Sequence, residues 1–217
     1  MKQALTDNPL VSIVIPAFNG ARYICASIDS ILKQDYPHIE LLVFDDGSTD
    51  ETIQILEQYG RNFIWETQPN VGQSATLNKG WQQSKGDILA YLSVDDILAP
   101  TAVSQAVSVL VGHPDMPVVY GDYDLIDENG KLIRHVHAPD FDYQRLIAEI
   151  EVQPGPGAFF RRKVFDFTGG WNPNLKQTPD FDFWLKAGLL GEFQHIKANW
   201  AQFRVHRDSQ THAEASP

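Results

Sequence analysis

Three pairs of carboxylates have residue types and spacings that could do chemistry: Asp45 with Asp46, Asp95 with Asp96, and Asp180 with Asp182. The first two pairs each follow an apolar run, and the third lies near the expected start of a late helix. Taken singly, each pair is also typical of a turn or a helix N-terminus. At one edge of a sheet, however, they would repel one another unless a cation lay among them. An all-oxygen site of this kind favours Mg²⁺ or Mn²⁺, which protein carboxylates commonly bind together with substrate phosphates.

The elements before residue 113 must place these acids. Short β-branched or apolar runs alternate with segments of helical periodicity, and Pro16 is expected to end the first run. The predicted strands cover 10–15, 40–44, 62–65 and 87–92, and the predicted helices cover 24–32, the segment holding Ile53 and Leu56, 74–84 and 100–111. This alternation predicts an α/β fold with one Rossmann-like, mostly parallel sheet and helices on both faces. Ligands of such sheets collect beyond the carboxyl ends of the strands.

The pattern changes after residue 113, where a smaller subregion is expected. Two apolar runs flank a turn at 127–130, which indicates a hairpin. Helices are predicted at 143–150 and 181–190, a last strand at 200–205, and a loose polar tail at 210–217. We therefore expect residues 1–217 to form a single domain.

Composition excludes several classes of protein. The chain has 217 residues, 43% of them apolar, and a formal net charge of −11, which disfavours nucleic acid as a partner. No apolar run approaches the roughly 20 residues of a transmembrane helix, and residues 1–10 do not resemble a signal peptide. A single cysteine, Cys25, allows no internal disulfide, so a cytoplasmic location is expected. An acidic protein that handles phosphates would need a metal to hold them, and Asp96 is placed to bind one.

Eight segments carry a resemblance that covers about residues 10–209. They are V-S-I-V-I-P-A-F-N-G (11–20), V-F-D-D-G-S-T-D (43–50), N-V-G-Q-S-A-T-L-N-K-G (70–80), G-D-I-L-A-Y-L-S-V-D-D-I-L (86–98), V-V-Y-G-D-Y-D-L-I-D-E-N-G (118–130), F-F-R-R-K-V-F (159–165), D-F-D-F-W-L-K (180–186) and F-R-V-H (203–206). In this order they resemble the family 2 glycosyltransferases with the GT-A fold. The resemblance implies a nucleotide-sugar-binding half at about 10–112 and an acceptor-binding half with the catalytic base at about 113–209.

The same resemblance assigns the donor site. Pro16, Ala17 and Phe18 would line the base and ribose of a nucleoside diphosphate sugar. Asp46 would accept a hydrogen bond from the base, and Asp95 would contact the ribose or the metal.

It also assigns the reacting groups. Asp96 would be the direct ligand of Mn²⁺ or Mg²⁺, and His206 would bind the metal or the diphosphate. Asp180 would be the base that deprotonates the acceptor hydroxyl, and its aromatic neighbours in sequence would raise its pKa. Asp182 is the alternative base.

The implied function is the inverting, metal-assisted transfer of a sugar from a nucleoside diphosphate sugar to an acceptor hydroxyl. Polysaccharide or glycoconjugate biosynthesis is the expected setting. The acceptor would be a saccharide or a lipid-linked molecule, and the latter would bring the chain peripherally to the inner face of a membrane. Trp81 and Trp171 could each stack on a sugar, although burial is the default for such side chains.

Three departures from the family pattern support an alternative. Ser93 stands where many relatives have Asp, Leu77 where many have Arg, and Pro179 where Glu is frequent. They favour a non-catalytic nucleotide-sugar binding module as the second hypothesis. A third, a phosphatase-type hydrolase with Asp45 as the nucleophile, leaves Asp180 and His206 without a role.

Overall fold

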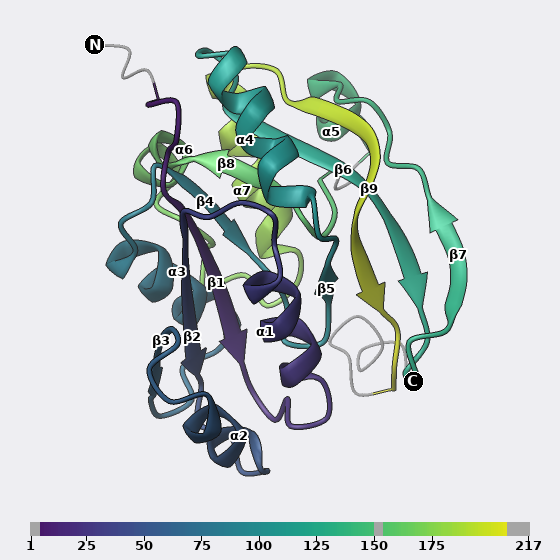
Figure 1. Ribbon diagram of the computed structural model, residues 1–217. Coiled ribbons are helices and arrows are strands. Elements are labelled where there is room, and N and C mark those ends of the chain that lie inside the picture. The colour runs from purple at the N-terminus through teal and green to yellow at the C-terminus, as the bar shows by residue number, and fades with distance from the viewer. Residues whose placement is uncertain (1–4, 150–153, 208–217) are drawn as a thin grey trace.

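The computed structural model describes residues 5–149 and 154–207, so the predicted tail at 210–217 lies outside the described residues (Figure 1). One nine-stranded sheet runs through the molecule in the order β3-β2-β1-β4-β8-β6-β9-β5, and β7 pairs with β6. The strands are β1 (Val11–Ala17), β2 (Ile39–Asp45), β3 (Ile64–Thr67), β4 (Ile88–Tyr91), β5 (Ile97–Leu98), β6 (Val118–Ile126), β7 (Leu132–Val136), β8 (Phe159–Arg161) and β9 (Gln194–Arg204).

Strand directions bring distant segments to one edge of the sheet. β1 to β4 are mutually parallel, as predicted, and Ala17, Asp45 and Thr67 lie in register at their carboxyl ends. β8 runs antiparallel to both β4 and β6, while β6 and β9 are parallel to each other. β6 and β9 therefore run in the same sense as β4, so Ile126 and Arg204 end at the edge where the acidic loops begin.

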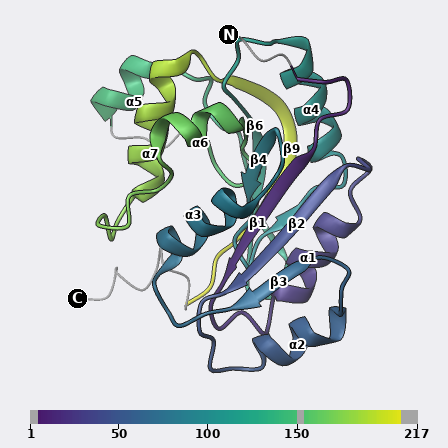
Figure 2. The same cartoon turned by 90° about the vertical axis from the view of Figure 1, so that its left-hand side faces the viewer.

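Helices cover both faces of the sheet (Figure 2). The helices are α1 (Ile24–Leu32), α2 (Thr52–Tyr59), α3 (Gln73–Gln83), α4 (Ala102–Gly112), α5 (Tyr143–Glu149), α6 (Arg162–Thr168) and α7 (Pro179–Ala187). Buried residues of α1, α2 and α4 pack in the cluster on one face, and those of α3, α5, α6 and α7 pack in the cluster on the other. None of the helices in the described part of the chain is both long and apolar enough to cross a membrane.

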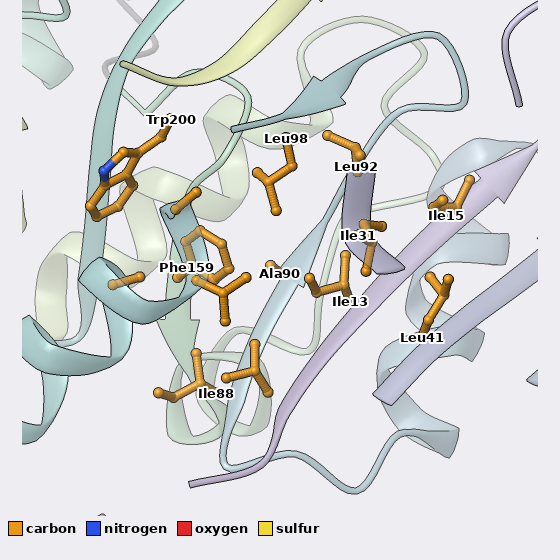
Figure 3. Packing of buried hydrophobic residues seen from close by; sticks show 14 of the residues in the cluster. Ile13, Ile15, Ile31, Leu41, Ile88, Ala90, Leu92, Leu98, Phe159 and Trp200 are labelled. Atoms are coloured by element: carbon orange, nitrogen blue, oxygen red, sulfur yellow. The ribbon is translucent and has the colours of Figure 1, made fainter. Parts of the chain in front are cut away.

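The alternation of side chains along each strand supplies both cores. Ile13 and Ile15 of β1 point into the α1–α4 side with Ala90 of β4 (Figure 3), whereas Val14 points to the opposite side with Leu89. Both faces of these central strands are buried, which explains their nearly continuous apolar sequence.

The structure differs from the sequence prediction in its short elements. β1 continues through Pro16 to Ala17 instead of ending at the proline. The pairing of β1 with β4 ends at Val14. Pro16 therefore lies beyond the last paired residue on that side, and its lack of an N–H costs no hydrogen bond to β4. β5, β8 and α6 were not predicted, and β9 begins six residues earlier than expected. The hairpin is confirmed by the antiparallel pairing of β6 with β7.

Candidate active site

The loops that follow β1, β2 and β4 meet at the carboxyl edge of the sheet. Asn19 donates its backbone N–H to Ser48 Oγ at 2.8 Å and accepts the N–H of Thr49 on its side-chain oxygen at 2.8 Å. Gly20 lies so close to Val94 that an added Cβ would be 2.4 Å from Val94 Cγ2. A side chain at position 20 would displace Val94, so glycine allows the loops after β1 and β4 to pack directly against each other.

The three residues predicted to line the base are not equally accessible. Pro16 and Ala17 are buried parts of β1, whereas half of the Phe18 surface is exposed. An exposed phenyl ring at the rim could stack on a flat ligand. The contact of all three with a nucleotide stays a prediction.

The Asp46 carboxylate binds the loop that leads into α3. This buried carboxylate accepts three hydrogen bonds, from Gln68 Nε2 at 3.0 Å and from the backbone N–H groups of Val71 at 2.9 Å and Gly72 at 2.8 Å. These bonds fix the loop that precedes the helix. A hydrogen bond from a base to Asp46 stays a prediction and would have to be added to these three.

Asp45 is completely buried and serves the same loop system. It accepts hydrogen bonds from Thr67 Oγ1 at 2.7 Å and from the backbone N–H of Ser48. A nucleophile must reach its substrate, so this geometry gives no support to the hydrolase hypothesis.

The acidic motif after β4 is clamped by the end of β9. The buried Asp96 carboxylate accepts the backbone N–H of Arg204 at 2.9 Å, and the buried Arg204 guanidinium donates to the carbonyls of Asp95 at 2.9 Å and Asp127 at 3.1 Å. Two residues later, His206 Nε2 lies 2.8 Å from Asp95 Oδ2. Adjacent carboxylates thus have different surroundings: Asp96 is covered, and the Asp95 side chain retains 18% exposure.

Charge in this motif is only partly balanced. Burial raises the pKa of Asp96 well above its usual range, and the negative charge of Asp95 adds to the effect, with Arg204 opposing it. In the described part of the chain, no group of three or more His, Cys, Asp or Glu side chains is arranged to hold a metal ion. The binding of a metal by Asp96 and His206 stays a prediction.

Asp180 and Asp182 occupy different environments on α7. Pro179 takes the first helical position, where its fixed φ and missing N–H are favourable. Asp180 is half-buried, and burial raises its pKa. Asp182 instead pairs with Lys186 one turn later, with 2.6 Å between Oδ2 and Nζ. Of the two candidates, Asp180 has the surroundings that suit a base at neutral pH.

Tyr91 connects the two predicted halves of the site. It is the last residue of β4, and the negative charges of Asp180 and Asp96 both contribute, after burial, to raising its pKa. Its ring packs on the α3–α7 side of the sheet, the side of the helix that carries Asp180. Sequence reasoning missed Tyr91 as well as the clamp formed by Arg204; the residue alternation along β4 was the available signal for Tyr91.

Two of the departures from the family pattern have structural explanations. Leu77 is fully buried in the core of the α3 side, so it contributes packing there. Pro179 fits the first turn of α7. Ser93 is half-buried, and its carbonyl accepts a hydrogen bond from Ser27 Oγ at 3.1 Å.

A mixed α/β sheet with acidic loops at the carboxyl edge of β1, β2 and β4 defines the class of fold, and comparisons with known proteins agree with it. The family described as "Glycosyl transferase family 2" matches residues 12–169. An uncharacterized glycosyltransferase of Rickettsia typhi is 35% identical over 97% of this chain and 68% of its own length. Chondroitin synthase of Escherichia coli is 31% identical over 87% of this chain and 28% of its own.

The solved structure of S. aureus TarS 1–349 in complex with UDP-GlcNAc superimposes with a TM-score of 0.77 at 20% identity, covering 96% of this chain and 62% of that one. The chain therefore belongs to glycosyl transferase family 2 and has the GT-A fold, so the predicted family, fold and enzyme class are confirmed. Because it spans only part of chondroitin synthase, that protein's whole activity does not transfer to it.

Proposed function

We propose that this chain transfers a sugar from a nucleoside diphosphate sugar to an acceptor hydroxyl with inversion at the anomeric carbon. The observation that carries the proposal is that the Asp95–Asp96 motif follows β4 at the edge where the loops after β1 and β2 also meet, with half-buried Asp180 in the first turn of α7. A donor laid along this edge would have its nucleotide over the first two loops and its sugar toward α7.

Asp180 is the proposed base. It takes the proton of the acceptor hydroxyl, whose oxygen attacks the anomeric carbon from the side opposite the diphosphate. The new glycosidic bond forms as the bond to the diphosphate oxygen breaks, and the nucleoside diphosphate departs. A half-buried carboxylate with a raised pKa is a stronger base than an exposed one, which suits this proton transfer.

Mn²⁺ or Mg²⁺ is proposed as the cofactor, and the residues present fit it. Asp95 and His206 offer a carboxylate oxygen and an imidazole nitrogen 2.8 Å apart, both partly exposed, beside a second carboxylate that only Arg204 counters. Diphosphate oxygens and water would supply the other ligands. When bound, the ion would neutralise charge on the departing diphosphate. Asp96, predicted as the direct ligand, is better suited by its burial to holding β9 in place.

Calorimetric titration of UDP, dTDP and GDP, each with Mn²⁺ and with EDTA, tests the donor site. We expect metal-dependent binding of one nucleotide, lost in Asp95→Asn and kept in Asp29→Asn, a half-buried acid on α1 that pairs with Lys33. Release of that nucleotide from its sugar conjugate then tests chemistry. If none of the three nucleotides binds with the metal, the proposal is wrong; binding without turnover would favour the non-catalytic module.

We further propose a saccharide or lipid-linked acceptor and a role in polysaccharide or glycoconjugate biosynthesis in the cytoplasm. Support comes from the likeness to the chondroitin synthase of Escherichia coli. Product analysis with oligosaccharide acceptors, compared with water alone, tests this setting.

A further inference from the structure

Tyr91 lies at the point where the two halves of the site meet. Along β4, Ala90 points toward the α1–α4 side with Leu92, and Tyr91 points to the other side, where α3, α6 and α7 pack. It is four residues before Asp95, so the same strand end supplies the phenol and the acidic motif.

The ring of Tyr91 is held by aromatic neighbours. Its centroid is 5.0 Å from that of Trp171 in a T-shaped contact and 6.3 Å from that of Trp81. The backbone of Trp171 is held by the Asn78 side chain, which donates to the Trp171 carbonyl at 2.7 Å and accepts the Trp171 backbone N–H at 2.8 Å. A Cβ on Gly170 would clash with the Asn78 side chain, so the backbone here must approach closely. The phenol is therefore positioned before any ligand binds.

The hydroxyl of Tyr91 is nevertheless unused. Within residues 5–149 and 154–207 it makes no hydrogen bond, although the ring is half-buried. By contrast, the hydroxyls of Tyr36, Tyr120 and Tyr143 each donate to a backbone carbonyl at 2.7 to 3.1 Å. The indole N–H of Trp171 also has no partner in the described chain. Buried polar groups normally find partners, so the buried indole N–H of Trp171, beside the unused hydroxyl of half-buried Tyr91, suggests that a ligand bonds to one or both of them.

Tyr91 packs on the side of the sheet that α7, the helix carrying Asp180, also covers. Burial raises the pKa of the phenol above its usual value, and the negative charges of Asp180 and Asp96 add to the effect, so the hydroxyl is neutral. In an inverting transfer the anomeric carbon lies between the base and the departing diphosphate. A neutral phenol at the end of β4, on the α7 side of the sheet, can donate to a sugar hydroxyl and accept from another.

We propose that the Tyr91 hydroxyl hydrogen-bonds to the sugar being transferred and that Tyr91, supported by Trp171, determines which donor sugars are used. This inference rests on the proposed function, because it needs a donor whose nucleotide occupies the loops after β1 and β2. Bare nucleoside diphosphate does not reach Tyr91, whereas the matching nucleotide sugar does.

The test compares these two ligands in Tyr91→Phe, with Tyr36→Phe as the matched control, since Tyr36 bonds the Pro9 carbonyl away from the site. The ligands are UDP, dTDP and GDP with Mn²⁺, against UDP-glucose, UDP-galactose, UDP-GlcNAc, dTDP-glucose and GDP-mannose. We expect Tyr91→Phe to weaken nucleotide-sugar binding about 3- to 10-fold while leaving nucleotide binding unchanged, the loss of one hydrogen bond. Discrimination between UDP-glucose and UDP-galactose should shrink where the wild type shows it.

The results distinguish a failure of the Tyr91 inference from a failure of the proposed function. Equal weakening of nucleotide and nucleotide sugar in Tyr91→Phe would mean a structural role, and no change in either would mean no contact; each overturns the inference while the donor site stands. Wild-type protein that binds no nucleotide would overturn the proposed function and the inference with it. A melting temperature close to that of the wild type confirms that Tyr91→Phe is folded.

Discussion

Replacing Arg204 by Met should destabilise the domain and disable the acidic motif together. The buried guanidinium donates two hydrogen bonds, to the carbonyls of Asp95 and Asp127, and lies 4.6 Å from the ring centroid of Tyr23. Hydrogen bonds from a charged donor contribute about 1.5–3 kcal/mol each, and a cation–π contact adds ~1 kcal/mol. Because water can reach part of this site after the change, we expect a loss of about 4 kcal/mol in the free energy of unfolding.

The matched control is Arg162→Met. Arg162 also donates to backbone carbonyls, those of Gly86 at 2.6 Å, Ser84 at 2.9 Å and Trp81 at 3.4 Å, and to Ser84 Oγ at 3.0 Å, but it joins α6 to the end of α3. It is less buried, so its loss should cost about 1–3 kcal/mol. Urea denaturation measures both changes.

Binding separates the two variants. At a temperature where each is folded, calorimetry with Mn²⁺ and the nucleotide that binds should show at least tenfold weaker binding for Arg204→Met, because Asp95 and His206 lose their support. Arg162→Met should bind normally. A stability loss below about 1 kcal/mol for Arg204→Met, or equal binding by the two variants, would show that Arg204 does not hold the Asp95–Asp96 motif in place.

Further outcomes follow from α7 and α3. Asp180→Asn should lower sugar transfer about 10²- to 10⁴-fold and spare nucleotide binding, whereas Asp182→Asn should change transfer little; the reverse order would make Asp182 the base. Because burial raises the Asp180 pKa and only the ionised form accepts a proton, the wild-type kcat/KM should fall on acidification at a higher pH than for an exposed carboxylate. Gly80→Ala should destabilise the fold by about 1–3 kcal/mol in urea, since its Cβ would lie 2.4 Å from buried Val14. Gly112→Ala, with open space around it, should lose nothing.

Much of the fold could be predicted from sequence because, in the first half of the chain, the local hydrophobic patterns agree with the strands and helices that form. The runs at Val11–Ala17 and Ile39–Asp45 are strands with two buried faces, and helical spacing identifies α1 and α4. The missed elements have two to seven residues, too few for a period to be visible. The three residues of β8 form a strand because they pair with β4 on one side and with β6 on the other. Their paired residues in both strands lie at least 40 residues earlier in the chain.

The sequence by itself determined the order of motifs, and hence the family, the parallel first half and the acids at its carboxyl edge. Only the tertiary structure decided what each acid can do. Asp95 and Asp96 are neighbours, yet β9 returns 108 residues after Asp96 to bond its carboxylate, and His206 meets Asp95. The packing of Tyr91 on the same side of the sheet as α7, which carries Asp180, also came from the tertiary structure. The burial and the hydrogen-bond partners of these acids depend on contacts between segments far apart in the chain, and local sequence patterns do not predict such contacts.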